Sequence, residues 1–458
     1  MTAKRLLVAL TGTVLLAVLT GGPWYLGQRA EQVYRAEVAA LGRQPQALRV
    51  VSESYSRGWF QSQARLELSP AAGDLAKDLR LRIDSRVSHG PHVLADLGWP
   101  PALARVASTI HVEHPELRLA GVQADTRIGW NGASLTRLRL PALDQPANGD
   151  RPGVRTLPGQ AEVRFSPAAG SLQASIDLPS LELRQSGGKL LMAVRDLHAA
   201  NSSVPWVGGL RLVSGDVVLG HLNAHLDSGP LGAVEARDLR LSVLSQPGDG
   251  LLDFHLSSGA GALRIQGADY APSQVQVSVT RLDGATLAAL QQDLEVLAGR
   301  DLPEAMLGIA SAALLMRHLP ALAAADPCLA VERLDIATPS GPVTAHLSLG
   351  VQGLTAGDLE AGGGAWLRRL VVDGEMSLPR TVAVSLVAFL RHGQDAPGEV
   401  TPQRAEAQAA AAAREVDGLL RDGWISVDGE RLTTVVKLGD GLLTVNGKTL
   451  PTGGVLPL

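Results

Sequence analysis

The stretch ESYSRGWFQSQARLEL, residues 53–68, decides how the body of this chain is predicted to fold. Three aromatic residues surround Arg57–Gly58 in its first half, although aromatic residues make up only 3% of the chain. In its second half, the apolar residues Ala64, Leu66 and Leu68 alternate with polar ones. Alternation with a period of two is typical of a half-buried β-strand. The stretch therefore predicts a hairpin whose turn leads into a strand, and glycine at the turn predicts a positive φ.

Similar alternating segments recur along most of the chain, and turn residues separate them. With 50 glycines and 27 prolines, the composition suits many short strands better than a helix bundle. We therefore predict a mainly β fold with some α: an N-terminal transmembrane helix followed by an extended antiparallel β-rich body with a few helices. A barrel, a sandwich and an open sheet all fit this pattern. The clearest alternating segments are 79–84, 117–119, 138–140, 181–183, 239–241, 263–265, 425–427, 432–437 and 442–445.

Three later segments are predicted to be helical, and a fourth, residues 381–390, is ambiguous. The apolar segment Pro303–Ala324 contains Arg317, His318 and Pro320, which argue against a second membrane span. We expect it instead to be a buried or groove-covering helix. Residues 381–390 fit either a helix or a strand. The other two predicted helices are Ala285–Leu297 and Thr401–Leu420.

The N-terminus predicts a membrane anchor. Lys4 and Arg5 precede the uncharged run Leu6–Leu26, and a helix of roughly 20 apolar residues spans a bilayer. Trp24 and Tyr25 lie at its far end, where amphipathic rings favour the headgroup region. A cleaved signal peptide is the alternative, but no Ala-x-Ala site follows the run. The sequence favours an uncleaved anchor in a bacterial inner membrane, with the bulk of the chain in the periplasm.

These features divide the chain into five regions. They are an anchor at 1–27, a juxtamembrane helix at 28–45, a β-rich periplasmic region at 46–284, a helical segment at 285–325, and a C-terminal β-rich region at 326–458 with a helix near 401–420.

Composition excludes some functions. Charged residues are 19% of the chain and the net charge is -4, so no basic surface predicts nucleic-acid binding. The single cysteine, Cys328, cannot form an internal disulfide, and we expect its side chain to be buried. The sequence also lacks the glycine-rich, nucleophile-elbow and paired-cysteine motifs of common enzyme classes.

The histidines form three close pairs. His221 and His225 would share one strand face about 13 Å apart, which is too far for a common metal ion. The pair His89 and His92 flanks Gly90-Pro91, and we interpret it as a polar turn. The third pair is His111 and His114, and the scattered acids Asp84, Asp125 and Asp373 are interpreted as solvated strand residues. We predict no catalytic residue, no metal site and no cofactor.

Several landmarks together resemble a known group. They are Trp24-Tyr-Leu-Gly27, Tyr55-Ser-Arg-Gly-Trp-Phe-Gln-Ser62, His89-Gly-Pro91, Arg127-Ile-Gly129 and Leu442-Leu-Thr-Val-Asn-Gly-Lys448. In order and spacing the chain resembles the YdgA-like family of bacterial envelope proteins, a family of unknown function. The middle of the chain, from about residue 140 to 370, is similar only in its general residue pattern and contains no landmark motif. The resemblance implies an inner-membrane anchor, a periplasmic β-rich body and no established enzymatic activity.

Three functional hypotheses follow. The first is a non-enzymatic envelope protein that binds lipid or another envelope component, since strands rich in Leu and Val could hold an acyl chain. An ordinary sheet core gives the same pattern. The alternatives are a protein–protein scaffold in the envelope and a hydrolase that acts on an envelope polymer. The family-landmark residues, with a structural or binding role, are Tyr55, Arg57, Gly58, Phe60, His89, Gly90 and Pro91.

Overall fold

The fold is described from a computed structural model of the 458-residue chain. The chain folds into two compact units, unit 1 (residues 1–204) and unit 2 (residues 205–458). The structure describes residues 25, 27–32, 34–35, 38–39, 48–70, 80–89, 102–114, 117–118, 121–147, 149, 152–225, 232–298, 304–355, 357–358, 366–392, 402–439 and 441–451.

The prediction of a mainly antiparallel β fold with a few helices is confirmed. The predicted transmembrane helix lies almost wholly outside the described residues, which begin at Tyr25. Helical residues are described between 25 and 39, and strands follow from Leu48 onward.

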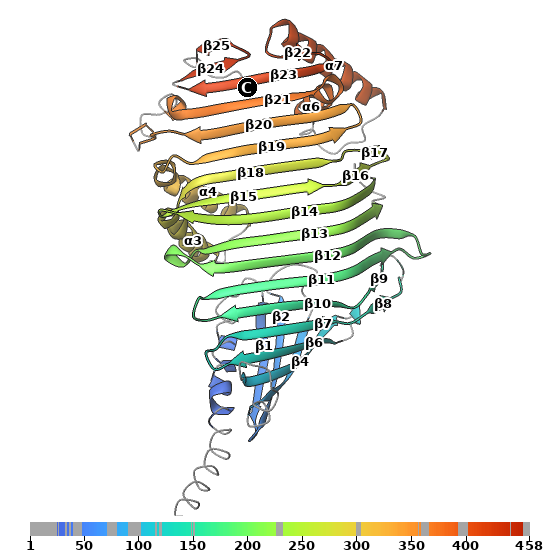
Figure 1. Ribbon diagram of the computed structural model, residues 1–458, viewed down its shortest axis with the longest axis vertical. Coiled ribbons are helices and arrows are strands. Elements are labelled where there is room, and N and C mark those ends of the chain that lie inside the picture. Colours follow the sequence, from blue (N-terminus) through green and yellow to red (C-terminus); the bar gives the residue numbers. More distant parts are fainter. Residues whose placement is uncertain are drawn as a thin grey trace, which may run out of the picture. The chain divides into compact units, whose positions relative to one another are not determined.

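Unit 1 is an antiparallel sheet (Figure 1). Its main strands pair in the order β1–β2–β3–β4–β6–β7–β10–β11–β12. The short β5 pairs with β4, and β9 joins β8 to β11. The strands are β1 (Leu48–Arg57), β2 (Gln61–Pro70), β3 (Arg80–Ser88), β4 (Ala102–His114), β5 (Leu117–Arg118), β6 (Val122–Gly129), β7 (Ser134–Leu140), β8 (Leu143–Gln145), β9 (Gly153–Thr156), β10 (Gly159–Ser166), β11 (Ser171–Arg184) and β12 (Leu190–Pro205).

The predicted hairpin forms from β1 and β2. Ala64, Leu66 and Leu68 are buried on one face of β2, as the alternation requires. The N-terminal helical residues cover this face, where Val38 packs with Leu66 and Leu68. Tyr34 packs at the edge of the same cluster. The first helix and the first hairpin therefore share a small core.

Unit 2 is a second antiparallel sheet, ordered β13–β14–β15–β18–β19–β20–β21–β23–β24–β25. The short β16 pairs with β14 and β17, and β22 pairs with β23. The strands are β13 (Arg211–His225), β14 (Ala233–Gly248), β15 (Leu251–Ala260), β16 (Ala262–Ile265), β17 (Ala268–Asp269), β18 (Ser273–Asp283), β19 (Cys328–Thr338), β20 (Gly341–Val351), β21 (Leu370–Pro379), β22 (Ser426–Asp428), β23 (Arg431–Gly439), β24 (Leu442–Val445) and β25 (Lys448–Pro451).

Two helix pairs lie at opposite ends of the strands of unit 2 (Figure 1). Helices α3 (Gly284–Ala298) and α4 (Glu304–Ala323) connect β18 to β19. Helices α6 (Arg380–His392) and α7 (Pro402–Arg421) follow β21, so residues 381–390 are helical rather than extended. Their core contains Ala383 and Val416 packed on Leu378 and Leu432 of the sheet. α6 and α7 therefore cover one end of one sheet face.

Helix α4 is mostly exposed, so the expectation that this segment is buried is wrong. Only 11% of the window Met306–Ala323 is buried, and by length and composition this window could cross a membrane. His318 contacts Asp293 of α3 at 2.9 Å, so one side of α4 packs on its partner helix. Ile309 and Met316 on its other sides are 73% and 65% exposed. α4 therefore presents apolar side chains outward.

Candidate functional site

The landmark residues meet around a buried histidine. The ring of His89 is fully buried, and its Nε2 lies 2.9 Å from Oγ of Ser62, the first buried residue of β2. The backbone N–H of His89 donates to the carbonyl of Phe60 at 2.9 Å. Gly27 of the first helix packs on the same ring: a Cβ at Gly27 would lie 2.6 Å from Cε1 of His89. Gly27 of the first helix, the hairpin turn and the end of β3 therefore meet at one point.

Three expectations for these residues are corrected. The His89 side chain is not exposed, as a polar turn would have it, but buried between β2 and the first helix. Gly58 is not among the positive-φ glycines; instead, a Cβ there would lie 2.2 Å from the carbonyl oxygen of Gln61. Glycine is therefore needed for a close backbone approach rather than for a left-handed conformation.

The third correction concerns the side chains expected to brace the turn. Arg57 pairs instead with Glu31 of the first helix at 3.6 Å. The Tyr55 ring lies 5.2 Å from the Tyr34 ring, and burial raises the pKa of the Tyr55 phenol. These side chains therefore attach the hairpin to the helix. Gly90 and Pro91, the remaining landmarks, lie outside the described residues.

The turn itself carries exposed aromatic side chains. Trp59 is 51% exposed and Phe60 is 43% exposed. Tyr25, two residues before Gly27, is 64% exposed. Since His89 contacts both Gly27 and the Phe60 backbone, the turn lies beside Gly27 of the first helix. Exposed aromatic residues thus gather where the predicted anchor joins the body.

A cavity of about 980 Å³ lies over the polar face of β1, β2, β3, β4, β6 and β7 in unit 1. Alternate residues along each strand lie on that face, and residues that the strand register pairs directly point to the same side. Two aspartates, Asp84 and Asp125, lie among the residues that line it. We call it the arginine cavity after its six lining arginines, Arg65, Arg86, Arg105, Arg127, Arg137 and Arg139.

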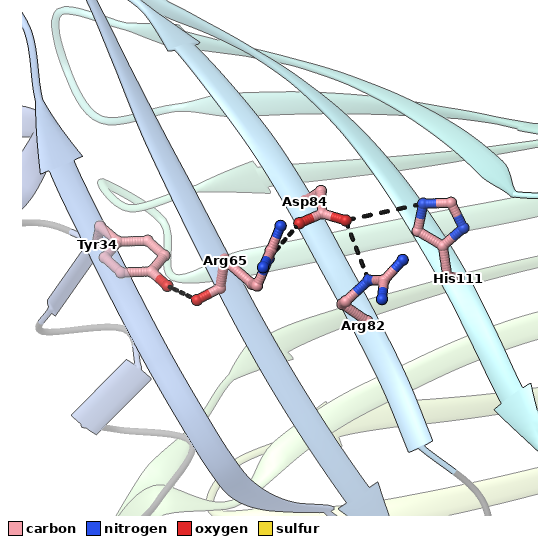
Figure 2. Close-up of polar contacts among 5 residues, drawn as sticks. All are labelled: Tyr34, Arg65, Arg82, Asp84 and His111. Atoms are coloured by element: carbon pink, nitrogen blue, oxygen red, sulfur yellow. Dashed lines mark hydrogen bonds and ion pairs between the residues drawn. The ribbon is translucent and has the colours of Figure 1, made fainter.

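Asp84 lines the arginine cavity and contacts three basic side chains (Figure 2). Arg65 of β2 donates to it at 2.7 Å, and Arg82 of its own strand donates at 3.2 Å. His111 of β4 lies 3.8 Å from the same carboxylate. The hydrogen bond from Arg65 is the main reason that the pKa of Asp84 is lowered. This carboxylate is held ionised, so it cannot serve as a general acid near neutral pH.

Asp125 lies among the arginines of the arginine cavity and contacts them closely. Arg105 donates to both carboxylate oxygens, with Nε at 3.0 and 3.1 Å. This fork lowers the pKa of Asp125, and the charges of Arg127 and Arg139 lower it further. On the next strand pair, Arg137 donates to Glu162 at 3.1 Å. Three of the six arginines therefore have a carboxylate partner.

One face of the unit 2 sheet is apolar along continuous rows of paired residues. The central row crosses eight strands, and seven steps of about 4.8 Å between strands make it roughly 34 Å long. Rows on either side contain residues such as Leu241, Val275 and Leu329. We call this surface the leucine face. Its central row is Gly215, Val243, Leu256, Val277, Val331, Leu347, Gly374 and Val436.

The leucine face is only partly covered. α6 and α7 pack on it at Leu378 and Leu432. Away from these helices, five leucines are each between 41% and 45% exposed: Leu241, Leu256, Leu329, Leu347 and Leu349. A contiguous exposed apolar surface on a folded protein marks a contact with a partner, a ligand or a membrane. The opposite face is polar, as in the hydrogen-bonded pair Ser242 and Ser257.

In the described part of the chain, the histidines and the cysteine singled out from the sequence lie apart from the two surfaces described above or outside a ligating cluster. No group of three or more His, Cys, Asp or Glu residues there is placed to hold a metal ion. His221 and His225 pair with Arg237 and Ala233 across β14. Cys328 is half-buried at the start of β19, rather than fully buried as expected.

Fold and surfaces together define a class: antiparallel β-sheet proteins whose sheets are amphipathic. A family model described as "Bacterial protein of unknown function (DUF945)" matches residues 3–452. The chain belongs to this family, which confirms the resemblance to YdgA-like proteins. Protein YdgA of Escherichia coli (strain K12) is 26% identical over 318 residues, which cover 61% of this chain and 60% of that relative. The matched part thus spans less than two thirds of the relative's length. No solved structure matches.

Proposed function

We propose that this chain is a non-enzymatic, membrane-tethered envelope protein that binds the acyl chains of lipid on the leucine face. The observation that carries the proposal is the continuous apolar surface in which five leucines stay more than 40% exposed. Each CH₂ group that leaves water contributes about 0.8 kcal/mol. A row roughly 34 Å long exceeds the length of one acyl chain, which spans about half of a 30 Å bilayer core.

The tether is supported by the surroundings of the first helix. The uncharged run Leu6–Leu26 follows two positive residues, which favours a cytoplasmic start and a periplasmic body. The exposed Tyr25, Trp59 and Phe60 lie together at this end of unit 1, as interfacial aromatic residues do. The exposed apolar side chains of α4 add a second surface suited to lipid contact.

Photolabelling of the full-length protein in detergent tests the acyl-chain site. The probe is a phospholipid with a diazirine near the end of one acyl chain, and labelled peptides are identified by mass spectrometry. We expect label on strands β15, β18, β19 and β20. Leu347→Lys should reduce labelling about fivefold or more, because a charge on this face costs at least about 1 kcal/mol to desolvate.

Ser348→Lys is the matched control, since Ser348 is the next residue and its side chain lies on the opposite face. It should leave labelling unchanged. Equal loss in both variants, or label spread over both faces, would contradict the acyl-chain site. Crosslinking to a defined envelope protein through the same leucines would favour the scaffold alternative instead.

A further inference from the structure

Beyond lipid tails, we propose that the arginine cavity of unit 1 binds a phosphate-bearing anion. The cavity is separate from the leucine face and lies wholly among residues of β1 to β7. Its six arginines outnumber its two aspartates, although the whole chain has a net charge of -4. Positive charge is therefore concentrated at this site.

Three of the arginines have no partner of their own. Among the residues that the structure describes, the side chains of Arg86, Arg127 and Arg139 make no hydrogen bond or ion pair. Each is exposed to the solvent in the cavity. The charge of Asp125 reaches Arg127 and Arg139, but both of its oxygens already accept from Arg105. The cavity therefore offers guanidinium donors that a bound anion could accept.

The strand register places two of these charges against each other. Arg105 and Arg127 are directly paired across β4 and β6, so their Cβ atoms are about 4.5–5.5 Å apart. Like charges at directly opposed positions destabilise a sheet. Asp125 neutralises Arg105 but is shared by Arg127 only at longer range. A local arrangement that costs stability marks a place where binding supplies the missing charge.

Phosphate is the anion that fits this set of donors. A guanidinium group donates two parallel hydrogen bonds to a phosphate, and several such groups can surround its oxygens. The hydroxyl of Thr109 and the amide of Gln123, which share the face of the arginines, lie among the lining residues as further donors. The cavity of about 980 Å³ is large enough for a phosphate that belongs to a larger molecule. A phospholipid headgroup and a free phosphate compound share this chemistry.

Calorimetric titration of the full-length protein in a non-ionic detergent tests the site. One arm uses inorganic phosphate, and the other uses dihexanoyl phosphatidylglycerol below its micelle concentration. We expect binding that weakens as salt rises, and the double variant Arg127→Gln with Arg139→Gln should weaken it by about tenfold or more. Binding in both arms supports phosphate itself as the recognised group; binding of the lipid alone supports the headgroup as its source.

The control removes the same charge elsewhere. Arg237 and Arg240 on β14 belong to unit 2, and Arg237→Gln with Arg240→Gln should leave both affinities unchanged. Thermal unfolding without ligand separates binding from folding: Arg127→Gln should leave Tm unchanged or raise it, because it removes a like-charge pair. The proposal is overturned if neither probe binds, if acetate binds as tightly as phosphate, or if both double variants weaken binding equally.

Discussion

Single residues explain why the landmark stretch is built as it is. Ser62 and His89 form a hydrogen bond in a site closed to water, and Gly27 leaves room for the imidazole. The pair joins β2 to the end of β3 beside the first helix. The stretch is therefore a joint between the first helix and the sheet, and its polar pair stabilises that joint.

Ser62→Ala tests this role. The substitution removes the bond to the buried Nε2, and loss of a buried hydrogen bond costs about 1–3 kcal/mol. We expect a decrease of that size in the free energy of unfolding, measured by urea denaturation of the full-length protein. Ser56→Ala, at an exposed serine of the same hairpin, should stay within about 0.5 kcal/mol of the parent. A Ser62→Ala effect no larger than this control would show that the joint does not depend on the pair.

At this scale the sequence predicted types of residue better than their contacts. The alternation of Ala64, Leu66 and Leu68 gave their burial, because a strand fixes which side each residue faces. The burial of His89 was missed, since its partners lie 27 and 62 positions away in the chain. A histidine beside Gly-Pro has the local signature of a turn. The only available signal was the joint occurrence of the three landmarks in one chain.

Among the elements, the turn between β1 and β2 has a second property. It lies beside the start of the first helix and exposes Trp59 and Phe60. If the preceding apolar run is a membrane anchor, as proposed, this turn must lie close to the bilayer surface. Its aromatic side chains would then enter the headgroup region.

Quenching of Trp59 by brominated lipid measures this approach. In bilayers with bromine near the headgroup end of the chains, we expect Trp59→Phe to lower the quenched fraction of the protein fluorescence. The control moves the tryptophan to the other end of β1, as Arg49→Trp in the Trp59→Phe background. That site is ten residues away, about 30 Å along a strand, so it should not restore quenching. Equal quenching from both positions would show that the turn is not the membrane-proximal end.

The sequence predicted helices and strands correctly where one face of the element is buried, because the spacing of apolar residues then follows the period of the element. The sequence predicted Thr401–Leu420, and α7 spans Pro402–Arg421. It left residues 381–390 open, because Val382, Val384 and Leu386 fit a strand as well as a helix. Packing on Leu378 and Leu432 favours the helix α6. Apolar composition did not predict burial for α4, whose contacts with α3 cover one side only.

For the whole molecule, the surfaces arise from register rather than from any local motif. The leucine face joins β18 to β19 although α3 and α4 intervene, and the arginine cavity draws on six neighbouring strands of the unit 1 sheet. Alternation showed that each strand has an apolar and a polar side. It could not show which strands pair, so neither surface was predicted from sequence. The division at residue 204 falls within β12, where no linker composition marks it.

Each proposed site lies within one compact unit, so we expect the two to act independently. Arg127→Gln with Arg139→Gln should weaken phosphate binding and leave acyl-chain labelling on β15 to β20 unchanged. Leu347→Lys should do the reverse. In the combined variant, the free-energy effects should add within about 0.5 kcal/mol, as they do for sites that act independently. Photolabelling and calorimetry are measured on the unsubstituted protein, the arginine double variant, Leu347→Lys and the combination of all three substitutions. These four proteins give the complete cycle.

A larger deviation from additivity would contradict independence in an informative way. It would show that binding at one site changes the affinity of the other. The short-chain lipid separates these cases, because its six-carbon chains bury little apolar area at about 0.8 kcal/mol per CH₂. With independent sites, its affinity should respond to the arginine substitutions and remain insensitive to Leu347→Lys.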